Sequence, residues 1–240
     1  MKHAIVLITF KPRDDIIAFY NSFNDYDVFV VIDDETLTYP NTDFSNVQYV
    51  QVSSKECKLK GICNTSNITL DKEVSGWDKA LYYMIYTSKV LYDHIWFIED
   101  DVFMKNEKTL LNIDEKYKYK HKDILCNSSF APGNLQEWHW NKIQIEYEPP
   151  YYCGMMCICR MSQCMIRCIQ SYAEQHQTLF FLEALFPTLA IKNGVNVIFS
   201  PEEFTSVVYR QDWKPEEIED HKLYHPIKTD HNTFRNAIKD

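Results

Sequence analysis

HIWFIEDDVFM, residues 94–104, runs four apolar residues directly into three consecutive acids. Residues 95–98 predict a buried strand, and Glu99, Asp100 and Asp101 follow at its end. Unpaired carboxylates are costly to bury, and a bound metal ion is one remedy. Mg²⁺ and Mn²⁺ take oxygen ligands, typically one or two carboxylates together with substrate phosphates. We therefore expect a divalent-metal site here, with a solvated turn as the alternative.

The order of the predicted elements indicates an α/β fold. Helices are expected near Asp14 and after Ser75, which is a fair N-cap. The predicted strands are 4–10, 27–35, 47–52, 94–99, 123–129 and 195–200. This alternation favours a largely parallel sheet flanked by helices, in which ligands bind at the carboxyl ends of the strands. Three strands end there in polar residues: Thr9–Lys11, Asp33–Glu35 and Glu99–Asp101.

The 240 residues fit one domain, 1–240, with a ligand-binding half over 1–104 and a second half over 105–240. In the second half, TLFFLEALFPTLAIKNG (178–194) predicts a helical segment that Pro187 divides in two and Gly194 ends.

Five of the eight cysteines lie in CGMMCICRMSQCMIRC, residues 153–168. Their spacing differs from the paired C-x-x-C pattern of zinc sites. From Cys157 onward, apolar residues recur at steps of three and four, which predicts a helix over about 157–173 with buried cysteines on one stripe. Free core cysteines favour a reducing compartment, and a metal site or a disulfide is the alternative.

The composition argues against two classes of protein. With 25 basic and 34 acidic residues the formal charge is −9, which suits a non-specific nucleic-acid binder poorly. AIVLITF (4–10) is too short to span a membrane and lacks a signal-peptide cleavage site. We expect no nucleic-acid partner, no transmembrane segment and a cytoplasmic location.

The element order, with WFIEDDVFM ending the fourth strand, resembles that of the nucleotide-sugar-dependent glycosyltransferases of the GT-A fold. The resemblance implies a GT-A-like, Rossmann-related, mostly parallel sheet in a single domain. Residues 1–104 are then the nucleotide-sugar-binding half, and residues 105–240 the acceptor-binding half with a C-terminal tail at the metal and the diphosphate. It also implies an acidic DxD-type motif that holds Mn²⁺ or Mg²⁺ against the donor diphosphate. Here the motif is E-D-D. Asp101 is then the direct metal ligand, and Glu99 or Asp100 faces the ribose, the metal or a metal-bound water.

A second matching stretch is LYHPIK, near the end of the chain. Several families of this fold use a late His as metal ligand and a following Lys on the diphosphate, which implies these roles for His225 and Lys228. Imidazole suits Mn²⁺, and lysine supplies a point charge to phosphate. His221 and His231 are competitors, and a surface His and Lys is the alternative.

The resemblance places the nucleotide over the ends of the first two strands and beside the helix that begins with SGWDKAL. The nucleotide-sugar-binding candidates are accordingly Thr9, Phe10, Lys11, Asp33, Asp34, Trp77, Asp78 and Lys79. Capping, packing or surface charge is the alternative for each of them.

Glu183 is the candidate general base, because it is a lone acid in the apolar stretch TLFFLEALFPTLA. Partial burial raises the pKa of a carboxyl towards the range useful for a base. Glu137 and Asp212 are weaker candidates. The acceptor-binding candidates form an aromatic group, because aromatic faces stack on sugars; they are Trp138, His139 and Trp140, with Tyr147, Tyr151 and Tyr152.

The sequence is therefore interpreted as a metal-dependent transferase that moves a sugar from a UDP-sugar to a hydroxyl of a glycan or glycoprotein. A base at Glu183 implies inversion, and a structural Glu183 would leave a retaining mechanism equally open. A sugar nucleotidyltransferase or metal phosphohydrolase is one alternative, although ITFKPRDD lacks the Gly-rich loop usual in the former. A non-catalytic glycan- or nucleotide-binding module is another.

Overall fold

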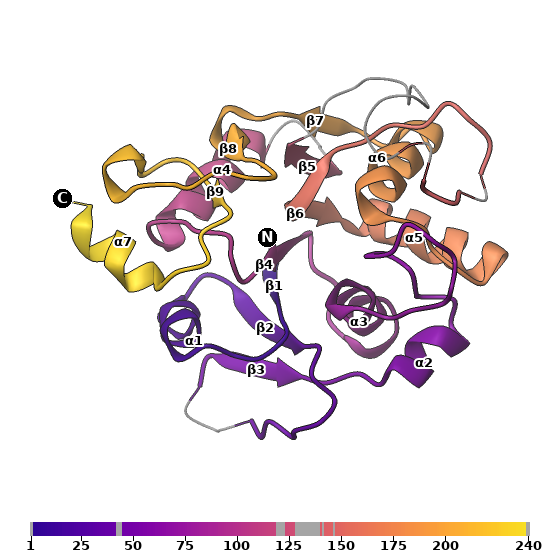
Figure 1. The fold of residues 1–240 in the computed structure, drawn as a ribbon, viewed down its shortest axis with the longest axis horizontal. Helices are drawn as coiled ribbons and strands as arrows, with labels where there is room; N and C mark the ends of the chain where they lie inside the picture. Colours follow the sequence, from indigo (N-terminus) through magenta and orange to yellow (C-terminus); the bar gives the residue numbers. More distant parts are fainter. Residues whose placement is uncertain are drawn as a thin grey trace.

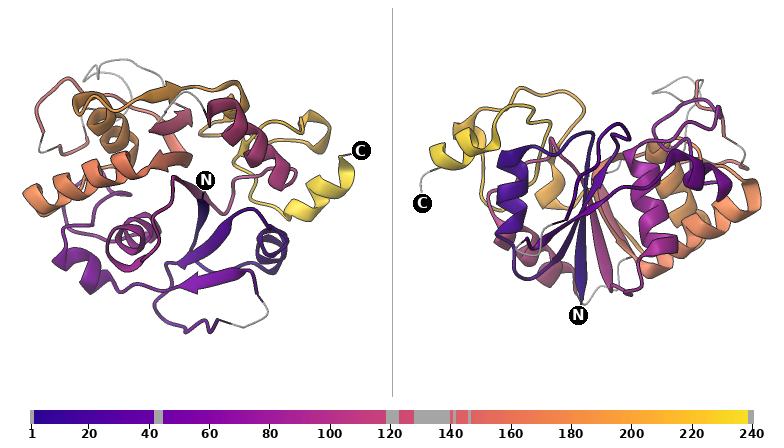
Figure 2. Two further views of the ribbon diagram at one scale, coloured as in Figure 1. Left: turned by 180° about the vertical axis from the view of Figure 1, so that it is seen from behind. Right: turned by 90° about the horizontal axis from the view of Figure 1, so that it is seen from below.

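The computed structural model describes residues 2–41, 45–118, 123–127, 140, 142–145 and 147–238. Within them, seven strands form one sheet in the order β3-β2-β1-β4-β6-β5-β7, with helices on both faces (Figures 1 and 2). The strands are β1 His3–Thr9, β2 Asp27–Ile32, β3 Val47–Val50, β4 His94–Glu99, β5 Ile124–Asn127, β6 Met155–Ser162 and β7 Val197–Phe199. The helices are α1 Asp14–Asn21, α2 Ser54–Leu59, α3 Gly76–Tyr82, α4 Glu107–Tyr117, α5 Gln163–His176, α6 Leu182–Lys192 and α7 His231–Ala237.

Alternate residues of the central strands enter two different cores, as the period of two requires. Ala4 and Val6 of β1 pack with α2, α3, α5 and α6, whereas Ile5 and Leu7 pack with α1 and α4. The right-hand view of Figure 2 shows the sheet between these two layers. Both cores contain residues from the two halves of the chain, so the chain forms a single domain.

The strand order reverses between β1 and β4. β2 and β3 extend the sheet from one side of β1, and the later strands extend it from β4. β1 pairs in parallel with both β2 and β4, and β6 is antiparallel to its neighbours β4 and β5. A crevice opens at such a reversal, beyond the carboxyl ends of the strands. The pairing of Ile8 with Glu99 puts the acids at that edge. The predicted mixed and mostly parallel α/β sheet, flanked by helices in a single domain, is confirmed.

The predicted helix over 157–173 is wrong in its first part. Residues Met155–Ser162 form β6, and α5 begins only at Gln163, where the Ser162 side chain accepts hydrogen bonds from the first turn. β6 is an inner strand covered on both faces, so its apolar residues do not alternate with polar ones, and such a run fits either element. All eight cysteines are free; five are buried, and Cys164 is exposed.

The predicted break at Pro187 is also wrong, because α6 continues through it. A proline inside a helix cannot donate to the carbonyl four residues earlier. That carbonyl belongs to Glu183, and it accepts from the backbone N–H of Gly154 instead, at 2.9 Å. Gly194 follows the helix with a φ of 65°, as the predicted helix stop requires.

Residues 201–238 cross back over the end of β4. Two short parallel strands, β8 Ser206–Val207 and β9 Tyr224–His225, form a separate small sheet. Backbone hydrogen bonds join Phe103 to Tyr224 in both directions, and the N–H of Ile227 donates to the Asp101 carbonyl at 2.8 Å. The tail is thereby attached to the acidic loop that follows β4.

Candidate active site

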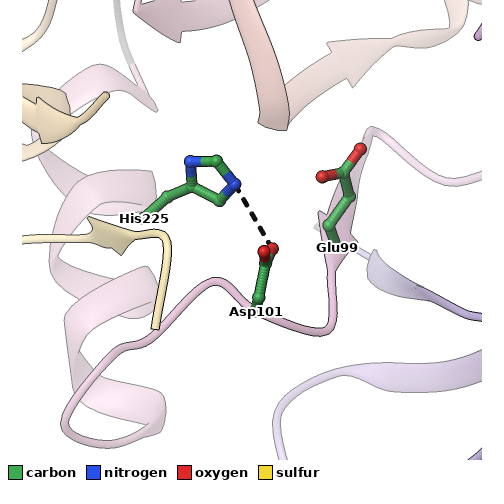
Figure 3. Close-up of side chains that lie close together, drawn as sticks. All are labelled: Glu99, Asp101 and His225. Carbon is green, nitrogen blue, oxygen red and sulfur yellow. Dashed lines mark ion pairs between the residues drawn. The ribbon is translucent and has the colours of Figure 1, made fainter. Parts of the chain in front are cut away.

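Glu99, Asp101 and His225 point towards one another from two distant parts of the chain (Figure 3). Glu99 ends β4, Asp101 lies in the following turn, and His225 ends β9. One ligand atom from each lies within 4.8 Å of the others. The attachment of the tail to the acidic loop thus places an imidazole opposite two carboxylates.

A backbone contact orients the His225 ring. Its Nδ1 lies 2.7 Å from the Val208 carbonyl oxygen, which can only accept a hydrogen bond. Nδ1 therefore carries a proton, and Nε2 is directed at Asp101 Oδ1, 3.3 Å away. Metal-bound histidines commonly donate their second ring N–H to a carbonyl in this way.

The pKa values of the three residues are shifted in different directions. Burial raises the pKa of Glu99, and the neighbouring charge of Asp101 adds to the effect. Burial also acts on Asp101, but its hydrogen bond to His225 and the charges of His225 and Lys228 outweigh it, so the pKa of Asp101 is lowered. Burial tends to lower the pKa of His225, and the contact with Asp101 raises it above its usual value.

This donor set fits a hard divalent cation. Two carboxylates and one imidazole suit Mn²⁺, and carboxylates suit Mg²⁺. Within the part of the chain that the structure describes, no other group of three His, Cys, Asp or Glu residues brings its ligand atoms this close. The structure thus brings together all three of the predicted metal ligands.

A hollow of about 200 Å³ lies at the strand ends beside the acids, and we call it the strand-end hollow. It is lined by Ile8, Thr9, Phe10, Asp33, Gly76, Glu99, Asp100 and Asp101. The Thr9 hydroxyl donates to Asp100, whose pKa is raised by burial and lowered in part by this bond. A Cβ on Gly76 would lie 2.7 Å from the Ile8 side chain, so only glycine allows α3 to start this close to β1.

Of the predicted nucleotide contacts, Phe10 is the most open, with 64% of its surface exposed. Lys11 is also exposed, and its Nζ lies 3.5 Å from Asp34 Oδ2. Asp34 itself is buried and accepts from the backbone and hydroxyl of Thr36. Phe10 and Lys11 can therefore meet a ligand, whereas Asp34 shapes the turn after β2.

Two predicted nucleotide contacts on α3, Asp78 and Lys79, are buried and bound to other residues of the protein. Asp78 is fully buried and accepts from Ser75 and Thr65. Lys79 is 1% exposed, and its Nζ binds Asp33 at 2.7 Å and Glu35 at 2.8 Å. The reason is that Asp78 completes the capping box of α3 and Lys79 neutralises the acids after β2.

Trp77 has a different position from its two neighbours. Its ring is buried, and its Nε1–H donates to Glu99 Oε1 at 2.6 Å. Trp77 therefore holds one of the candidate metal ligands in place.

A second hollow, of about 300 Å³, lies on the other side of the same acids, and we call it the Glu183 hollow. Its lining combines the acids with residues of α6 and the tail: Ser66, Glu99, Asp101, Met155, Cys157, Phe181, Leu182, Glu183, Tyr209, His225, Pro226 and Lys228. Burial and the charge of Glu99 raise the pKa of Glu183 to about 7. The predicted base therefore shares a hollow with the predicted metal ligands.

A third hollow of about 550 Å³ adjoins the Glu183 hollow through Pro226 and the exposed Lys228. Arg210, Asp212 and Trp213 also line it. Lys228 thus lies where two hollows meet, close enough for its charge to act on Asp101.

The competing histidines lie elsewhere. His221 is exposed and 3.9 Å from Glu219, whereas His231 is buried with its Nε2 2.9 Å from the Ile227 carbonyl.

The structure describes four members of the predicted acceptor group, Trp140, Tyr147, Tyr151 and Tyr152, and of these Trp140 is buried. Trp138, His139 and Glu137 lie outside the described residues. Trp140 is 4% exposed and stacks on Tyr151 in the core, so its ring is closed to a ligand. Tyr209, 66% exposed in the Glu183 hollow, was not predicted; no local pattern around it indicates a site.

No protein-family model and no curated protein matches the sequence. Solved structures with a similar chain path include mouse xyloside xylosyltransferase 1 in its apo form, 9% identical over 93% of this chain and 97% of that chain, with a TM-score of 0.45. Another is 2-C-methyl-D-erythritol 4-phosphate cytidylyltransferase from Thermus thermophilus, 8% identical over 98% of each chain, TM-score 0.48. A third is an active-site mutant of LgtC, 8% identical over 98% of this chain and 94% of that chain, TM-score 0.47.

Among the described residues, every helix is too short or too polar to cross a membrane.

Proposed function

We propose that this protein is a divalent-metal-dependent glycosyltransferase that moves a sugar from a UDP-sugar to a hydroxyl of a glycan or glycoprotein, with inversion. The observation that carries the proposal is the pair of hollows on either side of Glu99 and Asp101. One has the strand ends and an exposed aromatic ring, and the other has Glu183 with a pKa of about 7. This division suits a donor on one side of the acids and an acceptor on the other.

Each residue has a defined task in this reaction. Glu99, Asp101 and His225 would hold Mn²⁺ or Mg²⁺, which supplies positive charge beside the diphosphate. Lys228 lines the Glu183 hollow, and its charge acts on Asp101; it would stabilise the charge of the departing UDP beside the metal ligands. Glu183 accepts the proton of the acceptor hydroxyl as that oxygen bonds to the anomeric carbon. The bond between the anomeric carbon and the diphosphate oxygen breaks, and its electron pair leaves with UDP.

Calorimetry of UDP binding, with and without Mn²⁺, tests the proposal. We expect Mn²⁺ to increase the affinity of the wild type for UDP, and Asp101→Ala to remove that increase, because too few oxygens then remain to hold the ion. Asp220→Ala is the matched control, since Asp220 is an exposed acid that pairs with Lys105 outside the three hollows. An unchanged Mn²⁺-dependent affinity in Asp101→Ala would refute the metal assignment.

The products that the protein releases distinguish the rival activities. Incubation with UDP-sugars and Mn²⁺ should release UDP, whereas a nucleotidyltransferase would release pyrophosphate from a nucleoside triphosphate and a sugar phosphate. Binding of UDP with no metal dependence and no turnover would indicate a non-catalytic module.

A further inference from the structure

The segment Val208–Trp213 is a short loop fastened to His225 at both ends. The Val208 carbonyl lies 2.7 Å from His225 Nδ1, and the Val208 N–H donates to the His225 carbonyl at 3.3 Å. At the other end, Trp213 Nε1 donates to the same carbonyl at 3.1 Å. The loop therefore holds a fixed position relative to the candidate metal ligands.

Tyr209 is carried by this loop into the Glu183 hollow. Its side chain is 66% exposed, and the Arg210 guanidinium carbon lies 4.9 Å from its ring centroid. An arginine at this distance favours one ring orientation through a cation–π contact. The ring is thus oriented without being packed in a core, which leaves apolar surface for a ligand.

The described residues contain two aromatic side chains that are largely exposed and line a hollow, Phe10 and Tyr209. Phe10 lines the strand-end hollow, where the donor is placed in the proposed function. Tyr209 lines the Glu183 hollow, where the acceptor hydroxyl must reach the base. In the proposed function, Phe10 therefore lies beside the donor and Tyr209 beside the acceptor.

We propose that Tyr209 is the platform of the acceptor subsite and that the acceptor is a carbohydrate. A sugar presents an apolar C–H face that stacks on an aromatic ring, and its hydroxyls then extend sideways towards Glu183. A serine or threonine of a protein acceptor offers no comparable face. This inference rests on the proposed function, because it takes Glu183 as the base that the acceptor must reach.

The first experiment measures binding of the whole protein to arrayed glycans in the presence of UDP and Mn²⁺. We expect the wild type to bind glycans and Tyr209→Ala to bind the same glycans about threefold to tenfold more weakly, as the loss of an aromatic contact implies. Tyr209→Phe keeps the ring and should bind within about twofold of the wild type. Leu91→Ala removes an apolar side chain that is 81% exposed outside the three hollows, and it should change nothing.

The second measurement separates this inference from the proposed function. Tyr209→Ala should keep the wild-type affinity for UDP and Mn²⁺, because Tyr209 does not line the strand-end hollow in which the donor is placed. If the wild type binds UDP with Mn²⁺ but no arrayed glycan, or if Tyr209→Ala binds glycans normally, the platform is refuted while the transferase proposal stands. If Mn²⁺-dependent UDP binding is itself absent, the proposed function fails.

Discussion

Two clusters of buried charge adjoin β4, one around Asp114 and one formed by Glu99 and Asp101. They differ in how far neighbouring groups compensate the carboxylate charge. Asp114 of α4 accepts from Arg160 at 2.6 Å, from Tyr26 at 2.7 Å and from Trp96 at 3.2 Å. Its negative charge therefore faces a fully buried guanidinium and two neutral donors. No second carboxylate of the described chain forms part of this group of contacts.

Glu99 and Asp101 lie at the end of the same strand with fewer compensating groups. Among the described residues each has one side-chain partner, Trp77 for Glu99 and His225 for Asp101, and the charge of Asp101 adds to the raised pKa of Glu99. A buried carboxylate with its own cation and donors is already compensated, whereas adjacent carboxylates that border two hollows are suited to a cation from outside. The comparison separates a cluster that is paired within the fold from the proposed metal site.

The largest expected effect concerns Glu183, whose pKa the charge of Glu99 helps to raise to about 7. Glu183→Gln keeps the size of the side chain and removes the proton acceptor, so kcat should fall about a hundredfold to ten-thousandfold with UDP affinity unchanged. A base works when deprotonated, so the wild-type rate should rise with pH through a value at or below about 7, since a bound cation lowers this pKa. The variant should lose that rise. A near-wild-type rate, or retained configuration in the product by NMR, would remove Glu183 from catalysis.

Removing the carboxylate of the Asp114 cluster should lower the free energy of unfolding. Asp114→Ala leaves Arg160 buried and unpaired: Asp114 accepts from its Nη1, and its Nε and Nη2 have no hydrogen-bond partner in the described chain. The expected loss is about 3–5 kcal/mol of unfolding free energy in urea. Glu115→Ala is the matched control one residue further along α4, where an exposed carboxylate pairs with Lys118, and it should lose less than about 0.5 kcal/mol. Equal losses in the two variants would mean that the Asp114 cluster has no special role.

The cluster of Glu99 and Asp101, with His225 beside it, should be stabilised by added metal. An ion that binds only the folded state adds about 2.7 kcal/mol at a hundred times its Kd, so Mn²⁺ alone should raise the Tm of the wild type. His225→Ala removes one of the three ligands and should abolish most of that rise. Asp114→Ala should keep it, measured relative to its own lower Tm. An equal Mn²⁺ shift in His225→Ala would place the ion elsewhere.

Local patterns predicted the strand β4, the acids at its end and an acid at position 183 within an apolar helical segment. Both features can be seen in a short stretch of sequence, because one is a strand that ends in charge and the other a lone acid among apolar residues. The pattern over β6 predicts a helix instead of a strand because an inner strand has no alternation. Asp78 and Lys79 bind residues inside the protein because of the way α3 packs against the strand ends. A short sequence motif does not reveal that packing. Tyr209 enters the site only because its loop is fastened to His225, a contact between residues far from any recognisable pattern.

The smallest expected effect is a gain in stability from Glu99→Gln. Because the pKa of Glu99 is raised in the folded state, the folded protein favours the protonated acid. The stability that this gives is fully present below the unfolded pKa, which is near 4.5, and it is lost as pH rises through the folded pKa. Glutamine stays neutral at every pH and still accepts from Trp77.

Glu99→Gln should therefore unfold with about 0.5–1 kcal/mol more free energy than the wild type at pH 8 without metal, and with nearly the same free energy at pH 4. Glu115→Gln, an exposed change, should show no such dependence on pH. In Mn²⁺ the order should reverse, because the wild type gains the ion and the variant lacks one of its ligands. A variant that is less stable than the wild type at pH 8 without metal would show that Glu99 is already compensated, as Asp114 is, and would end the distinction between the two clusters.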